Sequence, residues 1–165
     1  MNEASLKAGA SMARGRSNQV VGTPREFLDA VEARFGKIVF DLAATKTNTV
    51  TGDKCFFGPG SEFGEDALNQ DWYSLVGTLW LNPPYSDIAP WAAKLALNRH
   101  RKGWTIMLVP ASVGSNWFAE NEPNCYVSGI RPRLIFVGST TPYPKDLMLM
   151  ISGFGIVGRE SWKWK

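Results

Sequence analysis

The residues best suited to chemistry in this chain are Asn82, Pro83, Pro84 and Tyr85, which directly follow the apolar run 79–81. Each proline pushes the residue before it toward an extended conformation, so Asn82 and Pro83 do not continue into a helix. Because a proline has no N–H group, the turn offers carbonyl oxygens beside an amide side chain and an aromatic ring. The sequence therefore predicts a stiff turn at the end of a strand.

This combination suits the activation of an exocyclic amine on a heteroaromatic base, whose nitrogen lone pair is delocalised into the ring. The side-chain oxygen of Asn82 and the carbonyl oxygen of Pro83 could accept the two hydrogens of the amine, while Tyr85 stacks on the base. Fixed acceptors stabilise developing positive charge, and the loss of one typically costs on the order of 10²–10³ in rate. A four-residue motif also allows a plainer interpretation, in which Pro-Pro only stops a strand and Tyr85 packs on the surface.

The elements that position this turn begin with a helix. Thr23 can cap it, Pro24 fits its first position, and Glu26 can reach back to complete a capping box. Gly36 ends the helix, whose apolar stripe comprises Phe27, Ala30, Val31 and Phe35.

A buried strand over 38–40 then delivers Asp41 at its carboxyl end, which is where open α/β sheets bind ligands. Asp41 could accept hydrogen bonds from ribose hydroxyls or from the amino group of a cofactor that carries an amino acid. From its position alone, it could equally well cap the next turn.

The segment between this strand and the Asn82 turn predicts few regular elements. Residues 43–57 are rich in threonine and contain no Gly-x-Gly loop, although 56–57 is compatible with a short strand and 58–60 with a turn. Asp66 and Asp71 are candidates for holding an adenine amino group, with Leu68 or Trp72 beside the ring. The two acids could also be ordinary loop residues on a solvated face.

After the turn, Ser86 or Asp87 is expected to cap a helix that packs through Trp91 and Leu95 and ends in the basic run 99–102. A strand over 104–109 follows, parallel to the one that ends at the turn. We expect a short helix near 115–118 and three closing strands at 125–127, 134–137 and 147–151. Phosphates could bind near their connections, 131–133 and 140–145, although ordinary polar loops fit as well.

Composition and charge indicate the class of protein. The composition of residues 1–19 predicts a disordered basic arm, and that of residues 20–165 predicts a single domain. Two separated cysteines and one histidine support neither a disulfide framework nor a zinc site, and no apolar stretch is long enough for a membrane span or signal core. We therefore expect a soluble cytoplasmic protein. Residues 26–71 hold nine acids and four bases, whereas residues 72–165 hold ten bases and five acids. The acidic segment suits a cationic small molecule and the basic segment a phosphate backbone. The difference could also reflect only two solvated faces of different charge.

Several of these elements, in this order, resemble the small phage-encoded DNA N6-adenine methyltransferases of the Dam type over about residues 22–155. The matching residues are Thr23-Pro24, Asp41-Leu42-Ala43-Ala44, Asp66-Ala67-Leu68 with Trp72, Leu81-Asn82-Pro83-Pro84-Tyr85-Ser86, Leu108-Val109-Pro110-Ala111 and Asn116-Trp117-Phe118.

The resemblance implies a Rossmann-like, class I α/β methyltransferase fold, shortened and with an antiparallel end to its mixed sheet. It implies S-adenosylmethionine as cofactor, DNA as partner, no metal, and a phage protein acting in the bacterial cytoplasm. Asn82, Pro83 and Tyr85 match the catalytic motif. The expected cofactor residues are Thr23, Asp41, Ala43, Asp66 and Leu68, and the expected DNA contacts are Arg131, Arg133 and Lys145.

The chain also departs from larger methyltransferases. It lacks their glycine-rich turn, and only forty residues separate Asp41 from Asn82, so one or two helices must be reduced to loops. No insertion is long enough for a target-recognition domain, which leaves the loops within 112–145 to read DNA. Asn-Pro-Pro-Tyr also serves methyltransferases of RNA bases and protein glutamine amides, and a catalytically inactive cofactor- or nucleic-acid-binding phage protein is the alternative from another class.

Overall fold

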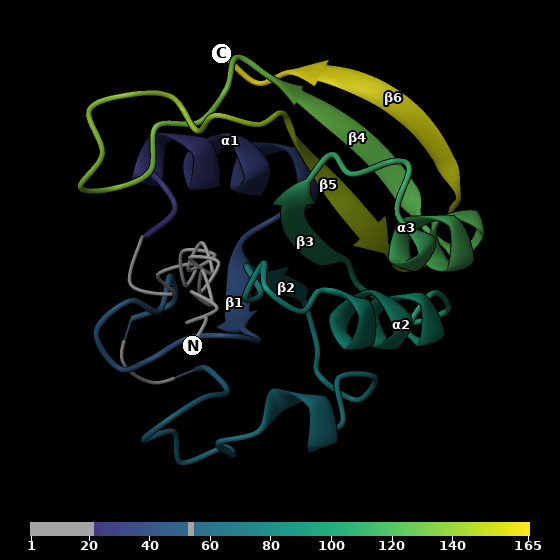
Figure 1. Ribbon diagram of the computed structural model, residues 1–165. Helices are drawn as coiled ribbons and strands as arrows, with labels where there is room; N and C mark the ends of the chain where they lie inside the picture. The colour runs from purple at the N-terminus through teal and green to yellow at the C-terminus, as the bar shows by residue number, and fades with distance from the viewer. Residues whose placement is uncertain (1–21, 53–54) are drawn as a thin grey trace, which may run out of the picture.

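Six strands form one twisted mixed sheet in the order β1-β2-β3-β5-β4-β6 (Figure 1). The computed structural model describes residues 22–52 and 55–165, so the basic arm expected over 1–19 lies outside the described residues. The strands are β1 (Ile38–Asp41), β2 (Thr78–Leu81), β3 (Thr105–Pro110), β4 (Tyr126–Arg131), β5 (Leu147–Ser152) and β6 (Gly158–Lys163). The helices are α1 (Arg25–Phe35), α2 (Ala89–Leu97) and α3 (Asn116–Asn121), with short 3₁₀ helices η1 (Ala67–Asn69) and η2 (Glu122–Asn124).

The directions of the strands confirm an α/β protein with a mixed sheet. β1, β2 and β3 are parallel, and β5 is antiparallel to both β3 and β4. The last strand of the chain, β6, is parallel to its neighbour β4. The expected antiparallel end of the sheet is therefore correct for β5 and wrong for β6.

Near the end of the chain, one predicted strand is wrong and one observed strand was not predicted. Residues 134–137 form no strand, because their N–H and carbonyl groups bond to loops: Val137 donates to the Gly22 carbonyl and Tyr143 donates to the Leu134 carbonyl. Buried Leu134 and Phe136 alternate with exposed neighbours there, which imitates a strand pattern. β6 was not predicted, since its one large apolar residue, Trp162, gives no such pattern.

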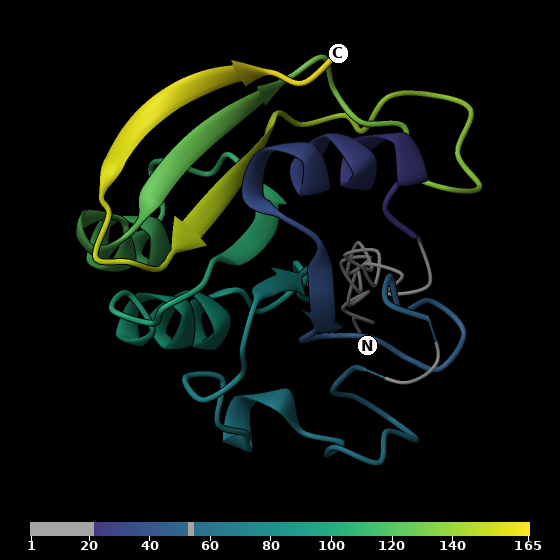
Figure 2. The ribbon, with the colours of Figure 1, turned by 180° about the vertical axis from the view of Figure 1, so that it is seen from behind.

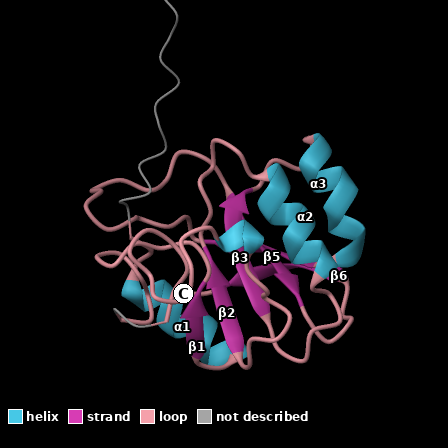
Figure 3. Ribbon diagram, turned by 90° about the horizontal axis from the view of Figure 1, so that it is seen from below, coloured by secondary structure: helices cyan, strands magenta, loops and turns pink. Residues whose placement is uncertain are grey.

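The sheet is covered on both faces, which gives two apolar cores. Successive residues of β2 alternate between them: Leu79 and Leu81 pack with α2 and α3, and Trp80 packs with α1. Figure 3 shows α2 and α3 side by side and α1 apart from them. None of the helices in the described ranges is long and apolar enough to cross a membrane.

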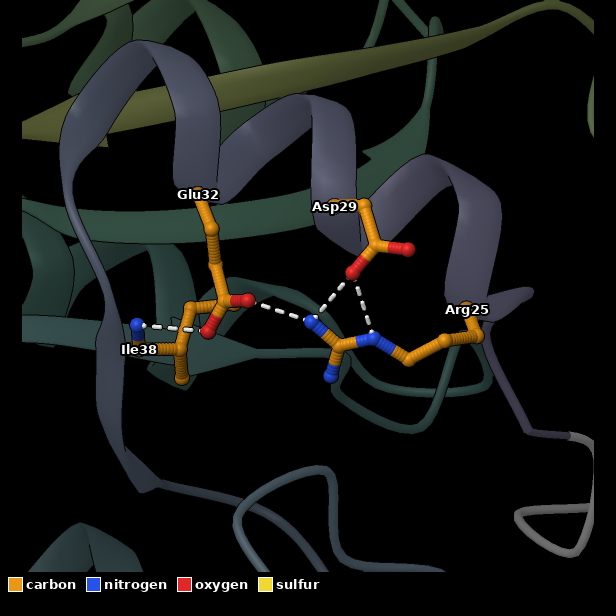
Figure 4. Close-up of polar contacts among 4 residues, drawn as sticks. All are labelled: Arg25, Asp29, Glu32 and Ile38. Carbon is orange, nitrogen blue, oxygen red and sulfur yellow. Dashed lines mark hydrogen bonds and ion pairs between the residues drawn. The ribbon is translucent and has the colours of Figure 1, made fainter.

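Helix α1 is held to the sheet by both apolar and polar contacts. Phe27, Leu28 and Val31 are buried, and Gly36, with φ at +87°, ends the helix as expected. Along its outer side Arg25 pairs with Asp29 and Glu32, and Glu32 also accepts the N–H of Ile38 at 2.9 Å (Figure 4). The Glu32 carboxylate thereby joins the helix to the first residue of β1.

The expected side-chain caps at the N-termini of α1 and α2 are not present. The N-cap of α1 is Pro24 and has no side-chain cap bond, because the Thr23 side chain is buried and Glu26 pairs with Lys165 at 3.0 Å. In α2 the N-cap is Ile88, also without a side-chain cap. This helix ends at Leu97, before the basic run assigned to its last turn.

The chain between β1 and β2 is almost free of regular structure, as the short spacing predicted. Figure 2 shows it as loops beneath the sheet, with η1 as the helical turn among its described residues. Its inner end extends the sheet beyond β1: Asp41 forms a parallel bridge to Phe56, donates its N–H to the Cys55 carbonyl and accepts from Phe57, both at 2.9 Å. The expected short strand at 56–57 is therefore a single bridge.

Candidate active site

The Asn-Pro-Pro-Tyr turn leaves the sheet at the carboxyl end of β2, between the ends of β1 and β3. Every residue of β2 is buried, so the strand has little freedom to shift. Asn82 is half-buried and Pro83 is buried, and Asp87 donates its N–H to the Pro84 carbonyl at 3.3 Å to close the turn. Within 22–52 and 55–165, no group donates a hydrogen bond to the Pro83 carbonyl oxygen or to the Asn82 side-chain oxygen.

Tyr85 is not the exposed ring that the sequence suggested. It is half-buried, and Tyr143 meets it edge-on with the ring centroids 6.1 Å apart. The Tyr85 hydroxyl is buried and has no hydrogen-bond partner in the described part of the chain, and this burial raises the pKa of Tyr85. Tyr143 is itself edge-on to Phe136 at 5.5 Å, so a small aromatic group covers the turn.

Asp41 is almost completely buried at the end of β1. Its two carboxylate oxygens accept the N–H groups of Ala43 at 3.2 Å and Val50 at 3.0 Å, which fixes the loop that follows. Burial raises the pKa of Asp41 to about 6, and these two hydrogen bonds only partly offset it. The carboxylate therefore caps the turn that follows β1, which was one of the two roles considered for Asp41 from the sequence.

Asp41 also lines a small cavity of about 20 Å³ that reaches Asn82 in the Asn-Pro-Pro-Tyr turn. The residues around this cavity are Gly22, Thr23, Asp41, Ala43, Asn48, Val50, Trp80 and Asn82. Three of the expected cofactor residues therefore lie around one space with the expected catalytic asparagine.

A larger cavity of about 210 Å³ lies beside the first one, and the two share Ala43 and Asn48. Its lining consists of Ala43, Ala44, Thr45, Asn48, Phe57, Gly58, Glu65, Asp66, Ala67 and Trp91. Asp66 is exposed at its rim and caps η1, accepting the N–H of Leu68 at 3.0 Å and the Asn69 amide at 2.6 Å.

The aromatic residue beside this larger cavity is Trp91 and not Trp72. Trp72 is buried, donates its indole N–H to the Ala67 carbonyl at 2.9 Å, and stacks behind Trp91 with centroids 6.2 Å apart. Leu68 packs against the core, and neither it nor Asp71 lines the cavity. Trp91 and Phe57 were missed because their sequence context reads as ordinary core packing.

Helix α2 connects the Asn-Pro-Pro-Tyr turn to this cavity. Lys94, one turn after Trp91, donates to the carbonyls of Leu68 at 2.7 Å and Gln70 at 2.6 Å. Its ammonium group also lies 5.1 Å from the centre of the Trp72 ring. One short helix thus holds both the ring beside the cavity and the loop that presents Asp66.

The three expected DNA contacts lie along one segment, 131–146. Arg131 is exposed at the end of β4, Lys145 is exposed in the loop, and Arg133 pairs with Asp146 at 2.9 Å. The same segment brings Tyr143 to Tyr85, so it borders the Asn-Pro-Pro-Tyr turn. In the portion of the chain that the structure covers, no cluster of His, Cys, Asp and Glu side chains could hold a metal ion.

Comparison with known proteins agrees with these observations. The chain is 31% identical to the "DNA N-6-adenine-methyltransferase" of Escherichia phage T1 over 104 residues, which are 62% of this chain and 40% of the phage protein. The chain thus matches less than half the length of that relative. The family model "DNA N-6-adenine-methyltransferase (Dam)" matches residues 11–147, which include β1, the Asn-Pro-Pro-Tyr turn and both cavities. The chain belongs to the DNA N-6-adenine-methyltransferase (Dam) family.

Proposed function

We propose that this chain transfers a methyl group from S-adenosylmethionine to N6 of adenine in DNA, in the host cytoplasm, using a shortened class I methyltransferase fold. The observation that carries the proposal is that Asn82, beside a proline carbonyl with no donor among the described residues, lines the same small cavity as Asp41 and Thr23. The Asn82 acceptor therefore lies beside a cavity that the carboxyl group of Asp41 also lines. Membership of the Dam family supports the choice of adenine N6.

Asn82 and Pro83 would act directly on the target amine. Their two oxygens accept the two N6 hydrogens and draw the nitrogen toward tetrahedral geometry, which frees its lone pair for in-line attack. Positive charge develops on N6 as the new bond forms, and fixed acceptors in a partly buried site stabilise that charge without reorganisation. In this transfer the S–CH₃ bond of the donor would break with its electron pair remaining on sulfur as a neutral thioether, and N6 would lose one proton to solvent.

A cofactor with both a nucleoside and an amino-acid end would span the two adjoining cavities, and the smaller one, of about 20 Å³, would have to widen to admit it. Bound S-adenosylmethionine would supply a methyl group activated by a sulfonium. We place its adenine in the larger cavity between Trp91 and Phe57, with Asp66 near its amino group. Asp41 and Thr23, at the smaller cavity, would hold ribose hydroxyls or the amino group close to Asn82.

Tyr85 would hold the plane of the target base. An adenine inside a duplex is inaccessible and has to be flipped out, at a cost of a few kcal/mol. Stacking on an aromatic ring returns roughly 1–3 kcal/mol of that cost. Because Tyr143 lies edge-on against Tyr85, the Tyr143 side chain has to turn away for the base to stack there.

The test is a methyl-transfer assay with labelled S-adenosylmethionine and, in parallel, duplex DNA, RNA and protein as acceptors. We expect label in DNA alone. Label in RNA or in a protein amide would reassign the substrate. Calorimetric titration with S-adenosylmethionine distinguishes the remaining alternative, since a nucleic-acid-binding protein without catalysis would show no heat of cofactor binding.

A further inference from the structure

Arg131 and Lys163 lie side by side at the ends of two neighbouring strands. β4 and β6 are parallel, and their register pairs Gly129 with Ser161 and Arg131 with Lys163. Figures 1 and 2 both show the two arrowheads ending together near the C-terminus. Register partners of parallel strands project from the same face about 4.8 Å apart, so the two cations start from adjacent positions.

Glu122 reaches this face of the strand pair, but it pairs with Arg159 at 2.6 Å, four residues before Lys163. Glu160 projects to the opposite face, where it accepts from Ser128 at 2.8 Å and pairs with Arg34 at 2.7 Å. Arg131 and Lys163 are both exposed, and neither has an ion-pair partner among residues 22–52 and 55–165. Two like charges this close repel each other until an anion lies between them.

The pair is also held in place by the residue that follows it. Trp164 donates its backbone N–H to the Arg131 carbonyl at 3.0 Å and its indole N–H to the Pro132 carbonyl at 2.7 Å. The strand ends are thus tied together beyond the last pair of the ladder. A guanidinium and an ammonium that extend from strand ends fixed in this way suit one phosphate group, because both donate charge-assisted hydrogen bonds to its oxygens.

The position of the pair relates it to the candidate active site. β4 and β6 run in the same direction as β2, so their carboxyl ends lie at the same edge of the sheet as the catalytic turn. The segment that starts at Arg131 carries Tyr143 to Tyr85. β6 lies outside the residues matched by the family model, which end at 147.

We propose that Arg131 and Lys163 together bind one backbone phosphate of the DNA whose adenine enters over Tyr85. The inference rests on the proposed function for the identity of the ligand and adds β6 to the DNA-contacting surface. It gives Lys163, which the sequence did not single out, the same role as Arg131.

The test measures the affinity of a labelled mixed-sequence duplex as a function of salt for the wild type, Arg131→Ala, Lys163→Ala and the double variant. One shared phosphate contributes about 0.9 to the slope of log affinity against log salt. We expect each single variant to lose most of this contribution to the slope and to bind DNA about tenfold more weakly. The double variant should lose little more than either single variant, because removing one cation already breaks the shared contact. Lys37→Ala is the matched control: it removes one exposed positive charge just before β1, at the opposite edge of the sheet, and should leave the slope unchanged.

Three results would overturn the inference. The first is a salt slope of Lys163→Ala equal to that of Lys37→Ala. The second is a loss of affinity in the double variant equal to the sum of the two single losses. The third is a wild type that binds no duplex DNA. Lys163→Glu, with the thermal midpoint of unfolding as a check on folding, gives a second version of the same test and should weaken binding further. Methyl transfer is measured separately, so a wild type that binds DNA through this pair but transfers no methyl contradicts the proposed function and leaves the inference intact.

Discussion

Asp41 shows how one side chain can serve both the fold and the candidate site. Its carboxylate orders the loop after β1 through Ala43 and Val50, and it also lines the small cavity with Asn82. Burial raises the pKa of Asp41 to about 6, so its charge changes in an accessible pH range. Three predictions at the residue scale follow, two from Asp41 and one from Trp91, which line the two cavities.

Cofactor binding should weaken as pH falls through about 6, where Asp41 becomes protonated. A neutral carboxyl group attracts the ammonium end of S-adenosylmethionine less than a carboxylate does, and its proton occupies one acceptor oxygen. Calorimetric affinities between pH 5 and 8 should therefore fall on the acid side for the wild type. Asp41→Asn should bind the cofactor weakly at every pH, so its affinity should not change with pH. If the affinity of this variant fell as steeply as that of the wild type, the titration would belong to another group.

The same group should affect stability in the opposite sense to an ordinary salt-bridged carboxylate. Because its folded pKa is raised, the folded state is favoured by protonation of Asp41. This contribution is lost as pH rises from about 4 to about 6, and it amounts to roughly 3 kcal/mol. Urea unfolding of the wild type and Asp41→Asn across this range should show their difference in free energy of unfolding changing with pH. A constant difference would contradict the assignment.

Trp91→Ala should reduce cofactor affinity by about tenfold, because loss of ring stacking against an adenine costs about 1–3 kcal/mol. Trp91→Phe should retain most of the affinity, since a smaller ring still covers the cavity wall. Trp104→Ala is the control, because Trp104 packs against Phe35 and Phe154 on the other face of the sheet. Equal losses of affinity in the two alanine variants would show that Trp91 acts only through stability.

At the scale of elements, β2, which ends at the Asn-Pro-Pro-Tyr turn, depends on an arginine outside the candidate site. Arg101 is buried and donates to the carbonyls of Leu75, Gly77 and Trp104, all just before β2 and β3. Burial lowers the pKa of this guanidinium, and its described acceptors include no carboxylate. It was expected to favour the end of α2, and its actual function is to hold the start of both strands.

Arg101→Met should therefore lower the free energy of unfolding by about 3 kcal/mol or more, because several buried carbonyls lose a charged donor at once. Arg101→Lys should recover little, since an ammonium cannot reach acceptors on three sides in the way a guanidinium does. Urea unfolding measures both changes. A loss below about 1 kcal/mol in Arg101→Met would mean that water replaces these hydrogen bonds.

The sequence predicted those elements whose local pattern agrees with their environment. Helix α1, β1, β2 and β3 have apolar residues where the structure buries them, and the prolines after Asn82 mark the end of β2. β6 and residues 134–137 were misassigned because tertiary contacts, not local pattern, decide which of them pairs: Trp162 packs on Phe27 and Phe35, whereas 134–137 bonds to loops. Trp91 could not be distinguished from a core residue, since only the fold shows that its ring borders a cavity.

At the scale of the whole molecule, the two halves of the chain meet at the turn after β2. The segment before the turn supplies most of the cavity lining and carries an excess of acids, and the segment after it carries the basic side chains at the ends of β4 and β6. Under the proposed function, a cationic cofactor and a phosphate backbone would bind on either side of Asn82. The central claim is that the two meet there at the N6 atom of an adenine.

The measurement that tests this claim most directly is nucleoside analysis of duplex DNA after incubation with S-adenosylmethionine and either the wild type or Asn82→Ala. We predict N6-methyldeoxyadenosine from the wild type and a rate at least about 100-fold lower from the variant, with cofactor affinity unchanged by calorimetry. DNA without N6-methyladenine after incubation with a wild type that binds the cofactor, or an Asn82→Ala variant that methylates at the wild-type rate, would contradict the account.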